Sequence, residues 1–369
     1  MSATLTDDFL SIVLNETPLL DVRAPVEFEK GAFFNATNIA ILEDKERELV
    51  GTKYKTHGNE AAVELAEELI KQEGKKQRVA AWKEYLEKNK NALLYCFRGG
   101  QRSGISQVWL SEVGVNITRL KGGYKAFRNF LMDESLSISE DVKTIIIGGR
   151  TGSGKTLLID KLDNAIDLEK LANHRGSSFG GFVKQQPSQI DFENSLAYAL
   201  IQFQAKNYEH LILEHESVNI GKAFIPKPVY NNLMDGKFIL LETPIETRVE
   251  IIFEDYISNS LEDYTLKYQD NGINVWAEVI NKSIDKIKKR VGGKLYMELK
   301  EIFNDALNRH ITNNDFTGYK ILIEKLLTQY YDPMYDYQLE KNKIPIIFKG
   351  NESEILEFLQ HSKQAFTKR

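Results

Sequence analysis

The chain has 369 residues, of which 42% are hydrophobic and 27% charged, and its formal net charge at pH 7 is -5. The length suggests more than one domain of ordinary globular composition, and no apolar run approaches the roughly 18 residues of a membrane span. The negative charge excludes a general attraction for nucleic acid, so a nucleic-acid partner would need a local basic surface.

Cys96 is the only cysteine of the chain. A lone cysteine excludes an internal disulfide and predicts a reducing, cytoplasmic setting. The first residues lack the basic-then-apolar pattern of a signal peptide, which agrees with that expectation. No metal-ligand spacing joins the six histidines, and we therefore expect no structural zinc.

The first segment of the chain alternates short apolar runs with helical stretches. Strands are predicted at residues 19–22, 38–42, 93–96 and 116–120, and helices at 61–72 and 103–113. This alternation is typical of a sheet with helices on its faces. The polar stretch 133–141 is expected to be a linker, which places one domain at residues 1–135 and a second at 136–369.

The strand that ends near Cys96 is predicted to deliver this thiol into a tight loop. Two glycines in the loop let backbone N–H groups point at one centre, and Arg98 and Arg102 place positive charge around the sulfur, which favours the reactive thiolate. The spacing from Cys96 to Arg102 suits a tetrahedral anion or a bound chalcogen atom. It leaves open both sulfur-group transfer through a persulfide or selenosulfide and phosphate-ester hydrolysis. The candidate catalytic residues are Cys96, Arg98, Gly99, Gly100, Arg102 and Ser103.

The second segment begins with a predicted strand at residues 143–147, a glycine loop and a helix. Further strands are predicted at 210–213 and 238–241, followed by a mainly helical stretch at about 246–340 and one more strand at 344–348. We expect the last strand to rejoin the earlier sheet, so that the helical stretch is an insertion.

The glycine loop after the strand 143–147 fits the phosphate-binding loop pattern at every defined position. In such a loop backbone N–H groups surround phosphate oxygens, while Lys155 supplies a point charge and Thr156 can ligate magnesium. The motif recognises phosphates without naming the rest of the ligand, so ATP or GTP remains open. The candidate phosphate-binding residues are Gly149, Arg150, Thr151, Gly152, Ser153, Gly154, Lys155 and Thr156.

Two further features of the second segment carry ligand chemistry. The strand predicted at 210–213 is followed by Glu214 and Glu216, and the alternation of side chains along a strand places both on the same side. We expect one of these carboxylates to order Mg2+ or water beside the phosphate-binding loop. The alternative is that both are solvated carboxylates past the end of the strand. His174 and Arg175 lie in a polar, glycine-punctuated loop and are candidate contacts for an anionic ligand, against the alternative of exposed loop residues.

One basic stretch offers a surface for nucleic acid. It lies in a predicted helix that breaks at Gly292 and Gly293, and its candidate contact residues are Lys282, Lys286, Lys289 and Arg290. A solvated helix face is the alternative interpretation. The four tyrosines at 330, 331, 335 and 337 are candidates either for stacking on bases or for packing.

Several short motifs of the first segment resemble the rhodanese family when taken in order. They are residues 20–28, residues 35–39, the Cys96 loop and residues 120–128. This resemblance implies a rhodanese-like α/β domain. Within it we interpret Asp21 and Arg23 as a structural ion pair, and Gly122 and Gly123 as a turn.

A rhodanese-like domain followed by a P-loop parallel-sheet domain with a large helical segment resembles the bacterial tRNA 2-selenouridine synthase family across essentially the whole chain. The resemblance rests on the Cys96 loop and on residues 148–156, 172–180, 186–189 and 214–221. It implies replacement of sulfur by selenium in the wobble 2-thiouridine of tRNA, with selenophosphate as donor. It also implies that geranyl diphosphate first alkylates the sulfur, which makes a better leaving group.

The two loops fit that scheme if the phosphate-binding loop holds the diphosphate and the Cys96 loop receives selenium or selenophosphate. The expected partners are tRNA, contacted through the basic helix, and selenophosphate synthetase as a donor partner. Two alternatives stay open from the residues alone. One is a cysteine-dependent phosphatase or other sulfurtransferase with a nucleotide-binding regulatory P-loop domain, and the other is a non-catalytic RNA-binding protein.

Overall fold

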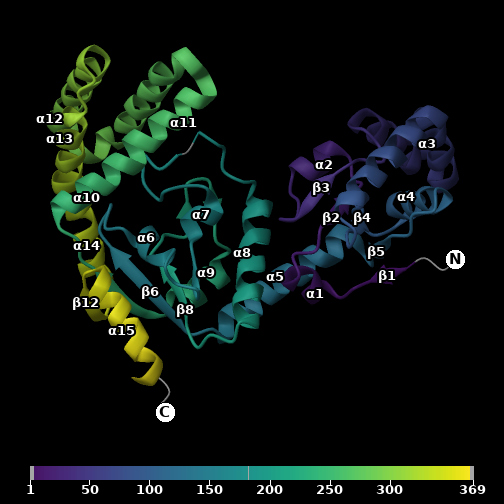
Figure 1. Cartoon of the computed structure of the whole chain (residues 1–369), viewed down its shortest axis with the longest axis horizontal. Helices are drawn as coiled ribbons and strands as arrows, with labels where there is room; N and C mark the ends of the chain where they lie inside the picture. Colours follow the sequence, from purple (N-terminus) through teal and green to yellow (C-terminus); the bar gives the residue numbers. More distant parts are fainter. Residues whose placement is uncertain (1–3, 182, 366–369) are drawn as a thin grey trace. The chain divides into compact units, whose positions relative to one another are not determined.

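The structure, a computed structural model, describes residues 4–181 and 183–365 of the chain (Figure 1). It consists of two compact units. Unit 1 comprises residues 1–141 and 187–207, and unit 2 comprises residues 142–186 and 208–369. The predicted boundary between 135 and 136 falls inside a helix of unit 1, and the segment 187–207 returns to unit 1 from within the second half of the sequence.

Unit 1 is built on a parallel sheet of five strands in the order β1-β5-β4-β2-β3. Its central strands are almost entirely buried because helices cover both faces. The strand predicted at 38–42 lies at residues 36–38 in the structure, and residues 39–42 do not form a strand. The strands are β1 (Leu5–Thr6), β2 (Leu19–Asp21), β3 (Ala36–Asn38), β4 (Leu93–Tyr95) and β5 (Thr118–Leu120).

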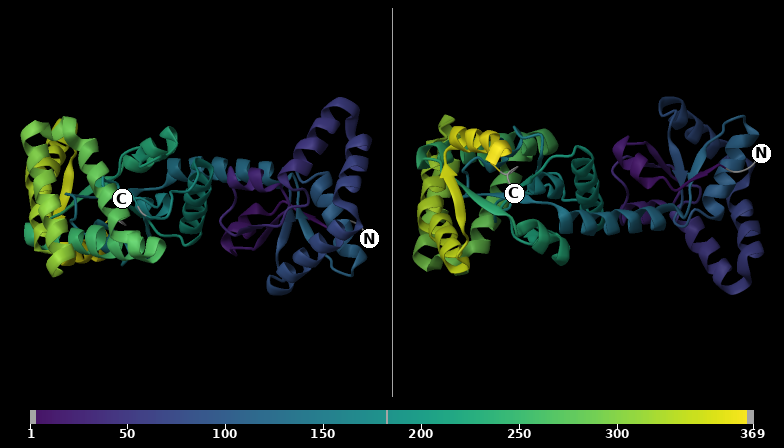
Figure 2. Two further views of the ribbon diagram at one scale, coloured as in Figure 1. Left: turned by 90° about the horizontal axis from the view of Figure 1, so that it is seen from above. Right: turned by 90° about the horizontal axis from the view of Figure 1, so that it is seen from below.

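The helices of unit 1 differ from the predicted ones at two places. The helix predicted at 61–72 is only the middle of α3 (Asp44–Lys88), which leaves helical geometry at Gly58 and Lys71 and therefore consists of three pieces (Figure 2). The predicted linker 133–141 is wrong, since these residues form the end of α5 (Gly123–Asp141). The other helices are α1 (Phe9–Leu14), α2 (Pro25–Glu29), α4 (Gln101–Glu112) and α8 (Gln189–Ala205).

The linker prediction failed because α5 has one apolar face among many polar residues. Phe127, Leu131 and Ile138 recur at helical spacing and are buried. On the same helix Arg128 donates to Asn194 Oδ1 of α8 at 2.7 Å, which fixes the returning segment to unit 1.

A buried ion pair lies at the end of strand β2 in unit 1. Arg23 Nη2 is 2.7 Å from Asp21 Oδ2, and both side chains are buried. The same guanidinium donates to Gly31 O at 2.9 Å and lies 4.0 Å from the centre of the Tyr124 ring. The interpretation of Asp21 and Arg23 as a structural pair is therefore confirmed.

Unit 2 contains a second parallel sheet of five strands in the order β12-β11-β6-β8-β7, and a separate hairpin of β9 (Asn219–Ile220) and β10 (Ala223–Phe224). β12 pairs with β11, which confirms that the last strand rejoins the sheet and that the helical stretch is an insertion. The remaining elements are β6 (Thr144–Gly149), β7 (Ala165–Ile166), β8 (Leu211–Glu214), β11 (Lys237–Leu241), β12 (Ile346–Gly350), α6 (Lys155–Ile159), α7 (Leu168–Ala172), α9 (Lys227–Met234) and α15 (Glu352–Ala365).

The insertion between β11 and β12 has a hydrophobic core of its own (green and yellow-green in Figure 2). Trp276, Phe303 and Tyr319 are completely buried at its centre, with the rings of Trp276 and Tyr319 meeting edge to face at 5.5 Å. The predicted break at Gly292 is confirmed as a kink. The insertion consists of α10 (Ile245–Ile252), α11 (Asn259–Tyr268), α12 (Gly272–Asn313), α13 (Thr317–Leu326) and α14 (Asp332–Asn342), joined by short helical turns.

Within residues 4–181 and 183–365, no helix combines the length and the apolar character that crossing a bilayer requires.

The buried ion pair of unit 1 should be sensitive to the loss of one partner. Arg23→Met leaves the Asp21 carboxylate buried and unpaired, and we expect it to lower the free energy of unfolding of unit 1 by about 3–5 kcal/mol. The double variant Asp21→Leu, Arg23→Met removes both charges and should recover part of that loss. Urea unfolding of the full chain, fitted with one transition per unit, measures both effects.

The control is the exposed pair Lys121–Asp7, whose side chains are 65% and 62% exposed. Lys121→Met should leave the transition of unit 1 nearly unchanged, because an exposed pair is screened by water. Equal effects of Arg23→Met and Lys121→Met would contradict a structural role for the buried pair.

Candidate functional site

Cys96 follows β4 directly and enters a loop that leads into α4. The cysteine is 3% exposed, and its Sγ lies 3.2 Å from Ser103 Oγ in the first turn of α4. The hydroxyl of Ser103 can donate to a thiolate at this distance. Cys96, Arg98, Gly100 and Arg102 all line one cavity, so the structure brings these predicted residues together.

Three carbonyl oxygens of the Cys96 loop accept hydrogen bonds from the start of α5 and from the Arg119 side chain. Tyr124 N donates to Cys96 O at 2.9 Å, Lys125 N donates to Phe97 O at 3.0 Å, and Arg119 Nη1 donates to Gly99 O at 3.2 Å. In a planar trans peptide the C=O and the following N–H point in opposite directions. The N–H groups that follow these carbonyls therefore point away from α5 and Arg119, as an anion-binding loop requires.

Gly123 makes this arrangement sterically feasible. Its φ is +60°, and a Cβ at this position would lie 2.3 Å from both Cys96 O and Gly99 N. Only glycine combines that conformation with so close an approach of two backbones. The Gly122–Gly123 pair was predicted to serve a turn, and in the structure it also seats the Cys96 loop.

The two arginines of the loop have different surroundings. Arg98 is exposed, whereas Arg102 forms an ion pair with Glu27 of α2, with Nη2 donating to Oε1 at 3.1 Å. Burial works against ionisation of Glu27, but the hydrogen bonds and charge of Arg102 hold the pKa of this carboxyl below its usual value. The charge of Arg102, expected around the sulfur, is thus shared with Glu27.

The phosphate-binding loop of unit 2 connects β6 to α6 and is held in the same manner. Lys155 Nζ donates to Gly149 O at 3.1 Å, Arg248 Nε to Thr151 O at 2.9 Å, and Thr243 Oγ1 to Ser153 O at 2.8 Å. Gly152 and Gly154 have φ angles of +77° and +86°. Such left-handed residues turn successive amides toward one centre.

The helical insertion supports this loop through a buried bidentate pair. Arg248 of α10 donates to both carboxylate oxygens of Asp332, at 2.9 and 2.6 Å, while its Nε holds Thr151 O. Two neighbouring residues of α14 add contacts: Gly149 N donates to the Tyr335 hydroxyl at 2.7 Å, and Arg150 Nη2 donates to Asp336 Oδ2 at 2.8 Å. The position of the loop therefore depends on residues about 100 to 190 positions away in sequence.

The tyrosines considered for base stacking have other contacts. Tyr330 and Tyr331 are each 7% exposed and belong to the core of the insertion, so the stacking interpretation is wrong for these two. Tyr335 binds the phosphate-binding loop, and Tyr337 is 62% exposed.

A group of carboxyls lies beside Lys155. Glu214, at the end of β8, is buried and accepts from Glu169 N at 2.8 Å. A Cβ at Gly176 would lie 2.2 Å from Glu169 Oε1 and 3.1 Å from both oxygens of Glu216, so these two carboxyls face the same spot. The predicted Glu214 and Glu216 are thus joined by Glu169 of α7.

Burial controls the ionisation of these carboxyls. It raises the pKa of Glu169 to about 9, with repulsion from Glu216 adding to the effect, and raises the pKa of Glu214 to about 8 with a further contribution from Asp167. Burial also raises the pKa of Glu216, although the Lys155 charge opposes this. Glu169 consequently holds a proton at neutral pH, which reduces the repulsion that a phosphate at the neighbouring loop would meet.

His174 and Arg175 belong to an ordered loop rather than to an exposed one. Arg175 Nε lies 2.7 Å from Asp255 Oδ2, and its guanidinium lies 5.0 Å from the centre of the Tyr256 ring. His174 Nδ1 accepts from Gly176 N at 3.1 Å. Burial lowers the pKa of His174, and the charge of Lys286 on α12 lowers it further, so this loop and the basic stretch are electrostatic neighbours.

The four basic candidates on α12 are all exposed. Lys282 makes a helical pair with Glu278 at 3.5 Å, and Arg290 Nη1 donates to the Tyr330 hydroxyl at 3.3 Å. Lys286 and Lys289 lie between these two residues on the same helix. They form one cationic stretch on the helical insertion, and the charge of Lys286 contributes to lowering the pKa of His174.

Comparison with known proteins covers nearly the whole chain. A family model described as the tRNA 2-selenouridine synthase AAA domain matches residues 142–366, and a model of the rhodanese-like domain matches residues 6–130. A protein of Sulfurovum sp. named tRNA 2-selenouridine synthase is 51% identical over 96% of this chain and 98% of its own length. The chain belongs to the tRNA 2-selenouridine synthase family.

Other members of the tRNA 2-selenouridine synthase family are similar over the same extent. The relative from Shewanella denitrificans is 44% identical over 97% of this chain and 98% of its own length. The relative from Hydrogenovibrio crunogenus is 45% identical over 96% of this chain and 98% of its own length. The predicted family and the predicted order of its two domains are therefore confirmed.

In this family member, sequence reasoning missed three sets of residues that shape the two loops. For Glu169 the sequence held only a weak signal, which is the capping residue Asp167 at the start of α7. Asp167 accepts a hydrogen bond from Lys170 N and so places Glu169 in the first turn of that helix. The pair of Arg248 and Asp332 carried none, because its members are 84 positions apart. Glu27 stood in a motif of the rhodanese-like domain, but its pairing with Arg102 required the fold.

The contact between Gly123 and the Cys96 loop can be tested with a matched variant. Gly123→Ala should destabilise unit 1 by more than about 1 kcal/mol, because the added methyl displaces the loop. In the wild type, bound inorganic phosphate should protect Cys96 from an alkylating reagent, and this protection should be lost in Gly123→Ala. Gly114→Ala also adds a methyl at positive φ (+79°) but meets no atom within 4 Å. It should lose stability and retain phosphate protection. If phosphate protects both variants equally, the contact does not shape the loop.

The carboxyls beside Lys155 predict a pH dependence of stability. Folded Glu169 keeps a proton up to about pH 9, whereas the unfolded chain loses it near 4.5, so the folded state binds the extra proton between these values. The free energy of unfolding of unit 2 should therefore fall as pH rises through this window, by at most about 1.4 kcal/mol per pH unit for each such proton.

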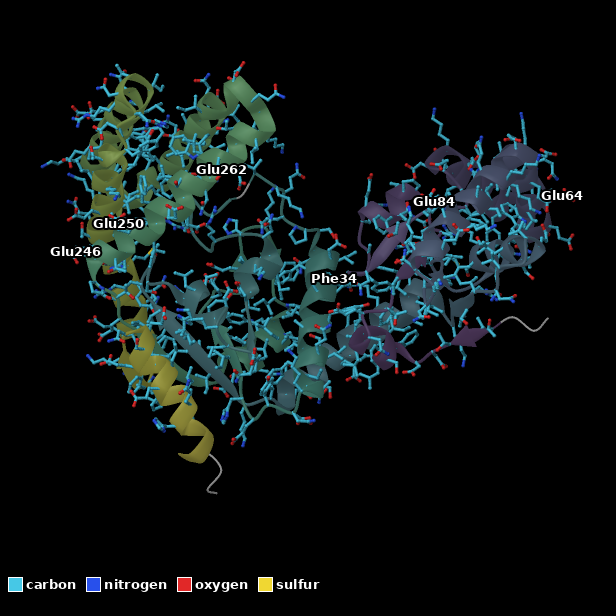
Figure 3. The ribbon with its side chains drawn as sticks, viewed as in Figure 1. Phe34, Glu64, Glu84, Glu246, Glu250 and Glu262 are labelled. Atoms are coloured by element: carbon cyan, nitrogen blue, oxygen red, sulfur yellow. The ribbon has the colours of Figure 1, made fainter. Side chains whose placement is uncertain are left out.

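Glu169→Gln should flatten that dependence, because glutamine does not titrate. Urea unfolding of the full chain at pH 6, 7.5 and 9 measures the slope. Glu262→Gln, at an exposed position on α11 (Figure 3), is the control and should leave the slope unchanged. An identical slope in the wild type and the Glu169 variant would show that Glu169 is ionised throughout.

Proposed function

We propose that this chain replaces the sulfur of wobble 2-thiouridine in tRNA by selenium, using selenophosphate, through an S-geranylated intermediate formed from geranyl diphosphate. The observation that carries the proposal is the presence, in one member of the tRNA 2-selenouridine synthase family, of a complete cysteine loop and a complete phosphate-binding loop. The names of the relatives support a tRNA-modifying enzyme over a phosphatase or a non-catalytic RNA-binding protein.

In the first half-reaction the thiouridine sulfur attacks C1 of geranyl diphosphate. The C–S bond forms while the C–O bond breaks, the diphosphate leaves with the electron pair of that bond, and the N3 proton of the base passes to solvent. The amides of the phosphate-binding loop and Lys155 would bind the diphosphate and stabilise the charge that develops on it.

The surroundings of the phosphate-binding loop favour a hydrocarbon tail over a nucleoside. A cavity of about 50 Å³ beside Thr151 is lined mainly by apolar side chains, among them Phe179, Ile252, Ile257 and Leu326. It is too small to enclose a ten-carbon chain, so these side chains would border the chain along one side. Apolar walls suit an isoprenoid chain, while they offer few groups that would recognise the polar edge of a purine.

Mg2+ fits the oxygen donors of this site. Within the described residues no three His, Cys, Asp or Glu side chains form a ready metal site, but Mg2+ is commonly held by one or two carboxylates together with substrate phosphates. Among the same residues Glu214 Oε2 is buried without a hydrogen-bond partner. Glu214, Glu216 and the Thr156 hydroxyl would hold the ion, which would neutralise charge on the departing diphosphate.

In the second half-reaction the Cys96 loop receives selenophosphate. The Cys96 thiolate attacks phosphorus, so that an S–P bond forms and the P–Se bond breaks, and selenide leaves with the electron pair. Selenide then attacks C2 of the S-geranylated base, the C2–S bond breaks, and geranylthiolate leaves with that pair and takes a proton. Water hydrolyses the S–P bond to phosphate, which restores the thiolate without any oxidant or reductant.

The tRNA would bind through the cationic stretch of α12. The four basic residues of this stretch are exposed: Lys282, Lys286, Lys289 and Arg290. The charge of Lys286 contributes to lowering the pKa of His174. Phosphate contacts of this kind position an RNA without reading its sequence. Selenophosphate synthetase is the expected source of the donor, because selenophosphate is consumed at the Cys96 loop.

The two half-reactions should respond to different variants. Lys155→Ala should abolish geranylation of a 2-thiouridine tRNA hairpin and should spare selenation of a hairpin that is already geranylated. Cys96→Ser should do the reverse, because it removes the nucleophile. Removing a group required in the transition state typically costs about 10²-fold or more in rate, which mass spectrometry of the nucleosides resolves easily.

Lys161→Ala, at an exposed lysine two residues beyond α6, is the control and should leave both half-reactions unchanged. If Lys155→Ala loses selenation of the geranylated hairpin while it keeps geranylation, the assignment of the loops is wrong. Competition between geranyl diphosphate and ATP for the full chain tests the ligand directly. Tighter binding of ATP would favour the nucleotide alternative.

A further inference from the structure

The cavity next to Cys96 is much larger than the donor anion requires. Its volume is about 770 Å³, and it is an open cavity lined mainly by α3, α4 and the Cys96 loop, all within unit 1. A water molecule occupies about 30 Å³ of liquid, so an anion of five heavy atoms occupies on the order of 100–150 Å³. The cavity therefore has room for a second, larger group beside selenophosphate.

One wall of the cavity is apolar. Ala62, Ala66 and Ile70 follow one another at four-residue spacing on α3 and so lie on one helix face, and Val63 lies beside them. Ile105 and Trp109 of α4 complete this wall. The small side chains at 62 and 66 leave the space that larger residues would fill. Such a wall has nothing to offer a phosphate, but it suits a branched hydrocarbon.

The mouth of the same cavity is polar and aromatic. Arg47, Lys55 and Arg98 are exposed residues of its lining, which also includes the acidic Glu48 and Glu67. Tyr54, on the first piece of α3, is 58% exposed and lines the cavity too. Cations bind the RNA backbone and an exposed aromatic ring offers a stacking surface for a base. The mouth of the cavity is thus suited to a nucleotide, and its apolar wall is suited to an alkyl chain.

We propose that this cavity binds the alkyl chain of an S-prenylated 2-thiopyrimidine nucleotide of tRNA, with Ala62, Ala66 and Ile70 setting the length of chain that is accepted beside Cys96. The proposal rests on the proposed function, whose second half-reaction has such a nucleotide as substrate. It adds that unit 1 recognises the chain itself, which then departs as the thiol once the C2–S bond breaks.

The test is single-turnover selenation of two synthetic anticodon hairpins by the full chain with selenophosphate. One hairpin carries S-geranyl-2-thiouridine and the other S-methyl-2-thiouridine. Ala66→Phe fills the cavity, so it should lower kcat/KM for the S-geranyl hairpin by roughly tenfold or more and affect the S-methyl hairpin far less, since even one methylene of misfit is worth that much. Ala80→Phe, the same change at an exposed position of α3 outside the cavity, should alter neither.

A second variant covers the case in which Ala66→Phe does not fold. Ile70→Ala enlarges the wall and should shift the preference of selenation from a geranyl toward a farnesyl chain by several fold. Equal losses on the S-methyl and S-geranyl hairpins, or no change of chain preference in Ile70→Ala, would overturn the proposal. Geranylation from geranyl diphosphate should be unchanged in every variant.

The controls separate this inference from the proposed function. If the wild-type chain does not selenate the S-geranyl hairpin at all, the proposed function itself fails. If it selenates the S-geranyl hairpin and Ala66→Phe leaves chain preference intact, only the cavity assignment fails.

Discussion

Both chemical loops of this chain depend on one constraint, the planarity of the peptide bond. Each loop has carbonyl oxygens fixed by donors on one side: the amides of α5 and Arg119 hold the Cys96 loop, and Lys155, Arg248 and Thr243 hold the phosphate-binding loop. Since the following N–H points the opposite way, fixing the carbonyls turns the amides toward the other side. The charged side chains of Arg119, Lys155 and Arg248 thus act on the loops from behind, and the backbone amides are left facing the side where an anion would bind.

This constraint explains the roles of elements that carry no chemistry. The N-terminus of α5 bonds the Cys96 loop, and the contact of Gly123 with Cys96 O and Gly99 N sets how near the two backbones come. In unit 2 the bidentate pair of Arg248 and Asp332 joins α10 to α14 and holds Thr151 O at the same time. The helical insertion therefore supports the phosphate-binding loop, even though it has a hydrophobic core of its own.

Local motifs predicted the position of the two loops, whereas long-range packing was out of their reach. The strand, loop and helix around Cys96 and around Lys155 are encoded within about ten residues each, so glycine spacing and apolar runs identify them. The helix at residues 133–141 was missed because its polar surface hides a buried face of wide spacing, including Leu131 and Ile138. The return of α8 to unit 1 depends on contacts such as Arg128 with Asn194, which no local pattern records.

The cavity of unit 1 and the smaller apolar cavity of unit 2 have a joint consequence for specificity. A hydrophobic pocket discriminates weakly between related chains, by roughly 10- to 200-fold for one methylene. On the proposed scheme the same prenyl group meets an apolar wall twice, once as a diphosphate beside Thr151 and once as a thioether beside Cys96. Successive selections multiply, so two modest pockets would exclude wrong chains more stringently than either pocket could. A protein with two such sites does not need high selectivity at either one. A base that is alkylated with the wrong prenyl group in the first reaction is a poor substrate in the second.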